Sequence, residues 1–235
     1  MQDLKENWKQ YLENGFNLVT SGTTGTPKTI FQEPEKLKAG NATAIDSQEI
    51  TSKSRVLTVC RMTHAGGTVA QTLPALSAGA HVDIIPFNAF SFFKDVSGYT
   101  HTHLAPMHCE LLLKTKAIKD VDLTGLWITC GSDPVHKRLI LPFVARGATY
   151  MCNWGMTEVG PCAINHVFRS VQDVHNTIYW NDEKTTILGT RKYCEYKIVE
   201  GALHVKGDIV LADDWFDTGD LVSENHGPIK YHGRR

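Results

Sequence analysis

The residues best suited to chemistry in this chain lie in the run TSGTTGTPK, which extends from Thr20 to Lys28. Glycine lets the backbone turn tightly and brings its N–H groups close to an anion. The hydroxyl side chains add hydrogen-bond donors, and Lys28 adds a positive point charge. We therefore interpret the run as a binding loop for a polyphosphate. Its other candidate ligands are Thr20, Ser21, Gly22, Thr23, Thr24, Gly25 and Thr26.

This loop has two other interpretations. The spacing of Gly22 and Lys28 is that of a Walker loop, but that motif has glycine directly before the lysine. Pro27 stands at that position, and proline has no N–H group to offer a phosphate. The second alternative, a hydrophilic surface turn, is disfavoured by the number of hydroxyl groups and glycines in the run.

The loop is similar to the phosphate-loop signature of the adenylate-forming superfamily. This group includes acyl-CoA and aryl-CoA ligases, luciferase and the adenylation domains of peptide synthetases. Other runs of the chain resemble the remaining motifs of the group, in the same order and with similar spacing. The resemblance covers about residues 16–235 and implies that the chain binds ATP or AMP.

The run NWGMTE, from Asn153 to Glu158, resembles the superfamily's aromatic-Gly-x-Thr-Glu motif. Trp154 stands where tyrosine or phenylalanine is usual, and an indole can still stack on adenine. The resemblance implies that the Thr157 hydroxyl reaches the α-phosphate and that Glu158 holds Mg²⁺, which prefers oxygen ligands. The alternative is a loop in which Trp154 fills the core. The other residues of this run assigned to the nucleotide are Gly155 and Met156.

Two runs near the C-terminus resemble motifs that hold the ribose. The run WFDTGDL resembles the Thr-Gly-Asp motif, which implies that Asp220 accepts hydrogen bonds from both ribose hydroxyls. The final run, YHGRR, resembles the start of the Gly-Arg-x-Asp hinge motif, whose arginine is Arg234 here and also helps to hold the ribose. A Gly-Asp turn in a β subdomain is the plainer alternative for the first run.

Weaker matches concern the acid substrate. His64, in the run HAGG, stands where the superfamily has a motif that borders the acyl pocket, although a lone histidine is more often structural. Gly131, in the run GSDP, resembles a glycine-rich turn beside adenine and the acyl group. Both residues are predicted to border the substrate pocket.

Two regions typical of the superfamily are reduced or missing in this sequence. Only about twenty residues precede the phosphate loop, and the sequence stops before the mobile C-terminal lid with its catalytic lysine. We therefore expect slow adenylation or none, unless a lid-bearing partner chain or a homo-oligomer completes the site.

Composition places the chain among ordinary globular proteins. Apolar residues make up 42% and charged residues 21%, and the net charge of -1 provides no field for nucleic acid or anionic membrane. The six cysteines include no Cys-x-x-Cys pair, which is typical of a reduced cytosolic protein. The charged N-terminus and the lack of ~18 consecutive apolar residues argue against a signal peptide or a membrane span. We predict a cytoplasmic protein without nucleic-acid or membrane partners.

Strand-like and helix-like runs alternate up to about residue 152, which predicts an α/β fold with a mostly parallel sheet and flanking helices. After about residue 170 short extended runs dominate, with no clear helix. We therefore predict a nucleotide-binding body at 1–170 and a small, barrel-like β subdomain at 171–235. The expected strands are 16–20, 56–59, 81–85, 100–104, 126–130 and 148–152, and the expected helices are 3–13, 66–77, 90–96, 106–115 and 134–145.

The resemblance implies that the carboxylate of a small acid attacks the α-phosphorus of ATP, that pyrophosphate leaves, and that the acyl group passes to a thiol such as coenzyme A. Lys28, Thr157 and Glu158 with Mg²⁺ are the predicted catalytic groups. Two alternatives stay open. The first is a nucleotide or acyl-adenylate binding protein without turnover. The second is a metal protein, although its ligand spacing matches no standard zinc motif; its ligands would be His101, His103, His108 and Cys109.

Overall fold

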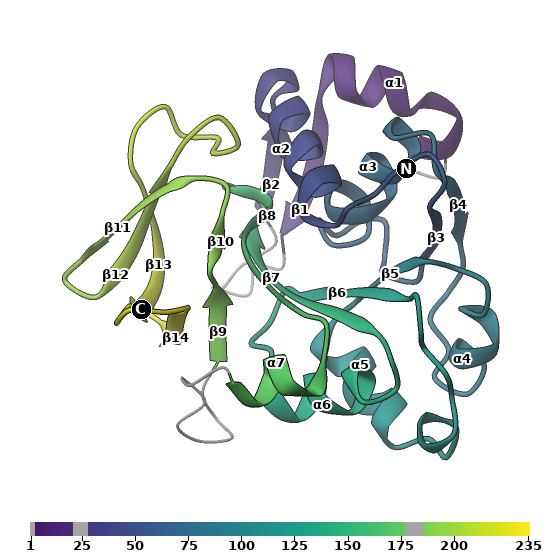
Figure 1. Ribbon diagram of the computed structural model, residues 1–235. Helices are drawn as coiled ribbons and strands as arrows, with labels where there is room; N and C mark the ends of the chain where they lie inside the picture. Colours follow the sequence, from purple (N-terminus) through teal and green to yellow (C-terminus); the bar gives the residue numbers. More distant parts are fainter. Residues whose placement is uncertain (1–2, 21–27, 177–185) are drawn as a thin grey trace.

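The structure is a computed structural model that describes residues 3–20, 28–176 and 186–235. These residues form three sheets: a two-stranded hairpin, a seven-stranded sheet and a five-stranded sheet. Figure 1 shows the seven-stranded sheet between two groups of helices, with the five-stranded sheet to one side. The hairpin consists of antiparallel β1 (Phe16–Thr20) and β2 (Lys28–Gln32), which flank the predicted phosphate loop.

The seven-stranded sheet forms the body, with the strand order β10-β8-β7-β6-β5-β3-β4. The strands from β3 to β7 run parallel, and β8 and β10 run antiparallel at one end. All residues of β5 and β6 are buried, as expected for central strands that are covered on both faces. The bounds are β3 Arg55–Thr58, β4 His81–Ile84, β5 His101–Leu104, β6 Trp127–Gly131, β7 Thr149–Met156, β8 Gly160–Phe168 and β10 Arg191–Lys192.

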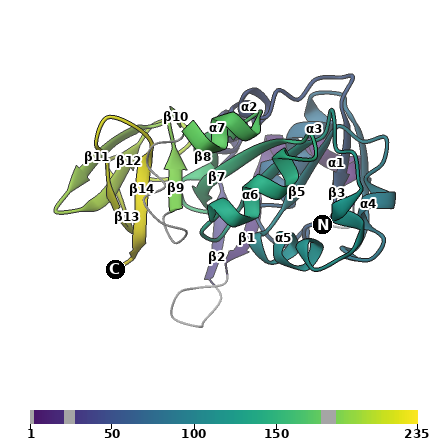
Figure 2. The same cartoon turned by 60° about the horizontal axis from the view of Figure 1, so that its bottom comes forward.

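Helices cover both faces of the body sheet. In Figures 1 and 2, α5, α6 and α7 lie together on one face, and α1, α2 and α3 lie on the other. The main hydrophobic core lies under the first group and includes Leu104, Ile128, Leu139, Phe143 and Tyr150, all fully buried. The bounds are α1 Leu4–Asn14, α2 Pro34–Ser47, α3 Leu73–Ser77, α4 Phe92–Asp95, α5 Pro106–Leu113, α6 Lys137–Val144 and α7 Val171–Asn176.

The five-stranded sheet is antiparallel and forms the β subdomain. Its order, β11-β12-β13-β14-β9, leaves β11 and β9 as edges, so the sheet is open in the described residues. Its apolar face packs in one cluster with residues of the β7–β8 pair, among them Trp154, Val159 and Ile164. The subdomain and the body therefore share a core. The bounds are β9 Thr186–Gly189, β11 Glu195–Val199, β12 Ala202–Lys206, β13 Phe216–Ser223 and β14 Ile229–Arg234.

The predicted α/β class with a mostly parallel sheet and a C-terminal β subdomain is confirmed. Some elements differ from the sequence-based expectation. Helix α2 and strand β8 were not predicted, and α7 lies where no helix was expected. The expected helix at 66–77 begins with a π-helical turn, Thr68–Thr72, and continues as α3. The division at residue 170 stays a prediction. Strand β10, which follows that residue, belongs to the seven-stranded sheet of the body. In the described part of the chain, no helix is long and apolar enough to cross a membrane.

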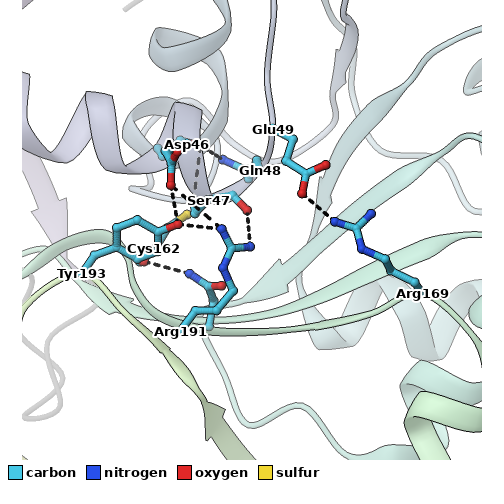
Figure 3. A network of polar contacts seen from close by, with 10 residues as sticks. Asp46, Ser47, Gln48, Glu49, Cys162, Arg169, Arg191 and Tyr193 are labelled. Carbon is cyan, nitrogen blue, oxygen red and sulfur yellow. Dashed lines mark hydrogen bonds and ion pairs between the residues drawn. The ribbon is translucent and has the colours of Figure 1, made fainter.

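A polar network fastens the chain that enters the subdomain to the end of α2 (Figure 3). The Arg191 guanidinium donates to the Ser47 carbonyl oxygen at 3.0 Å and to the Tyr193 hydroxyl at 2.6 Å. The Tyr193 hydroxyl in turn donates to Asp46 at 2.6 Å. Burial and the Asp46 hydrogen bond raise the pKa of Tyr193 to about 12, so this hydroxyl keeps its proton. The network fixes β10 against α2.

We predict that Arg191→Met lowers the free energy of unfolding by about 1–3 kcal/mol, because it leaves half-buried acceptors without their donor. Arg138→Met is the matched control, since Arg138 pairs with Glu110 on the surface, where both side chains are largely exposed. Its effect should stay within about 0.5 kcal/mol. Urea denaturation measures both variants, and equal losses would contradict a structural role for the network.

Candidate active site

A cleft of about 1280 Å³ opens at the carboxyl ends of the parallel strands. Its wall is built from the segments that directly follow β3, β4, β5, β6 and β7, and residues of the subdomain close one side. Open α/β sheets bind ligands at this edge, because the loops after parallel strands converge there. The fold therefore provides one large site at the place where the topology favours it.

The cleft brings together nearly all the described residues that the sequence predicted for the site. Gly131, the buried last residue of β6, does not line the cleft but directly precedes the lining residue Ser132. Residues 21–25, with Ser21, Gly22, Thr23, Thr24 and Gly25, lie outside the described residues, so their predicted role in phosphate binding stays a prediction. The predicted residues that line the cleft are Thr20, Lys28, His64, Asn153, Trp154, Gly155, Met156, Thr157, Glu158, Asp220 and Arg234.

Glycine is required at two of these positions because strands approach closely. A Cβ atom on Gly131 would lie 2.4 Å from the Asn153 carbonyl oxygen on β7. A Cβ atom on Gly155 would lie 2.5 Å from the Gly160 carbonyl oxygen on β8. The pairing of β7 with β8 is irregular at this point, between Trp154 and Met156. These contacts fix the path of the backbone into the turn that follows β7.

Two other segments form hydrogen bonds with the backbone of the turn that contains Thr157 and Glu158. The Gln32 side-chain amide donates to the Thr157 carbonyl oxygen at 3.1 Å. The Leu211 N–H donates to the Glu158 carbonyl oxygen at 2.9 Å. Both side chains therefore line the cleft from a fixed backbone. Gln32 was not predicted from the sequence. The only signal for it was a polar residue at the end of a short strand, and the structure shows that this residue is buried.

Trp154 and Asp220 meet across the junction of body and subdomain. The indole Nε1–H of Trp154 donates to Oδ2 of Asp220 at 2.8 Å. Oδ1 of Asp220 lies 3.5 Å from Nε of Arg234, which also donates from Nη2 to the Thr218 carbonyl oxygen at 3.1 Å. Burial raises the pKa of Asp220, while the Trp154 hydrogen bond and the Arg234 charge act in the opposite direction.

Trp154 is only 9% exposed and packs in the core that body and subdomain share. This burial is what the plainer alternative for Trp154 anticipated. A role in stacking on adenine stays a prediction for the part of the ring that lines the cleft. Tyr231, which sequence reasoning missed, also lines the cleft beside Asp220 and Arg234. Burial and the charge of Asp220 raise the pKa of Tyr231.

The opposite end of the cleft, at β5, β3 and β4, is largely apolar. Phe87 and His108 stack there, with ring centroids 4.1 Å apart and planes inclined by 19°. Nδ1 of His108 accepts the Ala105 N–H at 3.2 Å, so the proton of the neutral ring is on Nε2. Burial lowers the pKa of His108, which favours this neutral form. His64 is exposed on the same wall.

The residues of the alternative metal site do not gather. Among the described residues no group of three or more metal-binding side chains is present. His101 pairs with the Gln48 carbonyl oxygen at 3.0 Å, and His103 is fully buried with its pKa lowered to about 4 by burial. Cys109 packs against Cys130, with sulfur atoms 3.9 Å apart, and burial raises the pKa of Cys130. These side chains have structural partners instead.

Known proteins match this chain over most of its length. Residues 16–213 match the family described as AMP-binding enzyme. An indoleacetate–CoA ligase from Aromatoleum aromaticum is 37% identical over 148 residues, which are 61% of this chain and 29% of the ligase. A feruloyl-CoA synthase from Amycolatopsis is 23% identical over 228 residues, which are 88% of this chain and 46% of the synthase. The chain thus spans less than half the length of these curated relatives.

Solved structures with a similar fold cover nearly the whole chain. The inhibitor-bound N-terminal domain of FACL13 from Mycobacterium tuberculosis gives a TM-score of 0.77 at 17% identity, and the match covers 94% of this chain and 60% of that one. An adenylation domain of a keto acid-selecting NRPS module, bound to keto acyl adenylate, gives 0.78 at 18% identity, with 93% and 51% covered. At these identities the likeness concerns the fold.

We predict that Asp220→Asn makes the ligand-free protein more stable at about pH 7 and leaves its stability unchanged at about pH 3. Burial raises the folded-state pKa of Asp220. The folded protein therefore binds more protons than the unfolded chain just above the usual pKa of aspartate. Stability then falls as pH rises through this window, and a neutral amide avoids the loss.

Asp217→Asn is the control from the same strand. The Gly219 N–H and Arg235 lower the pKa of Asp217, so ionised Asp217 stabilises the folded protein, and the Asn variant should be less stable than the unaltered protein at about pH 7 but not at low pH. Urea denaturation at several pH values measures both variants. A gain for Asp220→Asn that does not depend on pH would contradict the electrostatic origin.

Proposed function

This chain belongs to the AMP-binding enzyme family, and on that premise we propose that it activates a carboxylic acid with ATP as an acyl-adenylate. The acyl group then passes to a thiol, for which coenzyme A is the proposed acceptor. The observation that supports this most is that a lysine, a Thr-Glu pair and an Asp-Arg pair from distant parts of the sequence line one cleft. These are groups suited to phosphates, a metal ion and a ribose.

The proposed nucleotide site lies at the β6–β7 end of the cleft. Asp220 and Arg234, from the subdomain, would hold the ribose hydroxyls. Lys28 and the Thr157 hydroxyl, from the body, would contact the phosphates and stabilise the charge that develops at the α-phosphorus. Asn153, Gly131 and the exposed edge of Trp154 would border the base.

Glu158 is the proposed ligand of Mg²⁺. Its side chain lines the cleft and is half-buried. Among the described residues, none forms a hydrogen bond or ion pair with the Glu158 carboxylate. Mg²⁺ is commonly bound by one or two carboxylates together with phosphate oxygens, so a single glutamate beside the phosphates fits this mode. When bound, the ion would neutralise phosphate charge during the displacement.

The acid would occupy the apolar end at β5, β3 and β4. Met62, Ile85 and Phe87 line this part, and His108 offers one N–H donor from its Nε2 atom. Such a wall suits a carboxylic acid with an apolar or aromatic body. Two relatives are named for aromatic acids, indoleacetate and ferulate, which supports an aromatic acid for this chain as well.

Exchange of radiolabelled pyrophosphate into ATP tests the proposal, with indoleacetate, phenylacetate, ferulate and acetate as acids. We expect exchange that depends on an aromatic acid and on Mg²⁺. Binding of AMP in calorimetry without exchange for any acid would assign the alternative function, a nucleotide-binding protein without turnover. Absence of both would overturn the proposed site.

We predict that Asp220→Ala weakens AMP binding more than Lys28→Ala does, and that the order reverses for pyrophosphate. The reason is that Asp220 is proposed to meet the ribose and Lys28 the outer phosphates. Loss of a charged hydrogen-bond partner costs about 1.5–3 kcal/mol. Calorimetry with each ligand measures the effects, and equal effects of both substitutions on both ligands would contradict the assignment.

A further inference from the structure

The Trp154–Asp220 hydrogen bond joins two motifs that are 66 residues apart in the sequence. Trp154 belongs to β7 of the body, and Asp220 belongs to β13 of the subdomain. The donor is the indole N–H, which phenylalanine lacks and tyrosine does not offer at the same place on the ring. The contact therefore depends on the residue that departs from the pattern usual at this position.

We propose that Trp154 is a positioning residue for the ribose site, whose indole N–H fixes the Asp220 carboxylate in the orientation that receives a ribose hydroxyl. The inference rests on the proposed function, because it requires a ribonucleotide in the cleft. This role uses the indole N–H of Trp154 and is separate from the predicted stacking of its ring on adenine.

The geometry around Asp220 restricts how its carboxylate can turn. The Asp220 side chain is only 9% exposed, and Trp154 occupies one lone pair of Oδ2 at 2.8 Å. Arg234 lies beside Oδ1 at 3.5 Å, which is longer than an ordinary hydrogen bond. The indole is therefore the closest anchor of the carboxylate. The remaining lone pairs are available to a ligand in the cleft, which Asp220 lines.

The indole itself has little freedom to move. Trp154 pairs with Ile164 on β8 and lies in the buried cluster that also contains Leu203 and Ile229. A hydrogen bond from a fixed donor to an ionised acceptor is stronger than one between neutral groups. An acceptor that is already oriented loses less conformational entropy when the ribose binds. Trp154 thus contributes to ribose affinity without touching the ribose.

Removal of the indole N–H also has an electrostatic consequence. The groups that act on Asp220 are the Trp154 N–H from β7 and Arg234 from β14. Tyr231, also on β14, is itself acted on by Asp220, and by Asp133, which follows β6. The Trp154 hydrogen bond lowers the pKa of Asp220 against the effect of burial. Without it, the carboxylate takes up a proton at a higher pH and stops accepting from the ribose there.

The test is Trp154→Phe, measured by calorimetry with AMP and with the analogue of AMP that lacks both ribose hydroxyls. We expect the affinity for AMP to fall about tenfold, because the Asp220 carboxylate is then no longer oriented before the ribose binds, and the affinity for the analogue to stay within about twofold. The pH below which AMP binding is lost should move upward in the variant. Thermal unfolding of each protein confirms that it is folded.

Trp127→Phe is the matched control. The Trp127 indole N–H is buried but has no hydrogen-bond partner among the described residues, so the variant loses an indole without changing the site. It should leave both affinities and the pH profile unchanged. If Trp154→Phe does not fold, 3-benzothienylalanine at position 154 keeps the ring shape and replaces the N–H with sulfur, and the same results are expected.

The outcomes separate this inference from the proposed function. No binding of AMP to the unaltered protein overturns both. Binding to the unaltered protein, with equal AMP affinity and an equal pH profile for Trp154→Phe, overturns only the role of Trp154. An equal loss for AMP and for the analogue also overturns it, because the effect would then come from the base or from the fold.

Discussion

The arrangement of the site depends on the hydrophobic cluster that the subdomain shares with the β7–β8 pair. The body contributes Trp154 and Ile164 to this cluster, and the subdomain contributes Leu203 and Val205. Burial of apolar surface is the dominant favourable term in folding, so this shared cluster sets how the two sheets lie together. The Asp220 carboxylate reaches the cleft only because the five-stranded sheet is held in this position.

The parallel strands bring residues that are distant in the sequence to one edge of the sheet. Five consecutive carboxyl ends open into the cleft, so each loop after a strand adds to its wall. The antiparallel strand β8 then reverses the chain and leads it towards the subdomain. Close contacts at Gly131 and Gly155 hold the ends of β6, β7 and β8 next to one another without side chains between them.

Much of this architecture could be predicted from the sequence, because the alternation of strands and helices and the order of the motifs are local signals. Helix α2 was missed since its buried positions include Gly40, Asn41 and Ser47, which give no apolar periodicity. Strand β8 was missed because it follows β7 after a very short turn. The Trp154–Asp220 contact could not be predicted, since no pattern in either motif reports which way an indole N–H points.

The shared core also has a thermodynamic consequence. Two sheets that bury one cluster between them lose it together, so body and subdomain should unfold as one cooperative unit rather than in sequence. A molecule that binds in the cleft touches both sides of that unit, and its binding free energy then adds to the stability of the whole chain. A rise in the melting temperature of this protein therefore reports binding of a ligand in the cleft, and acids and nucleotides can be compared in this way without an assay of turnover.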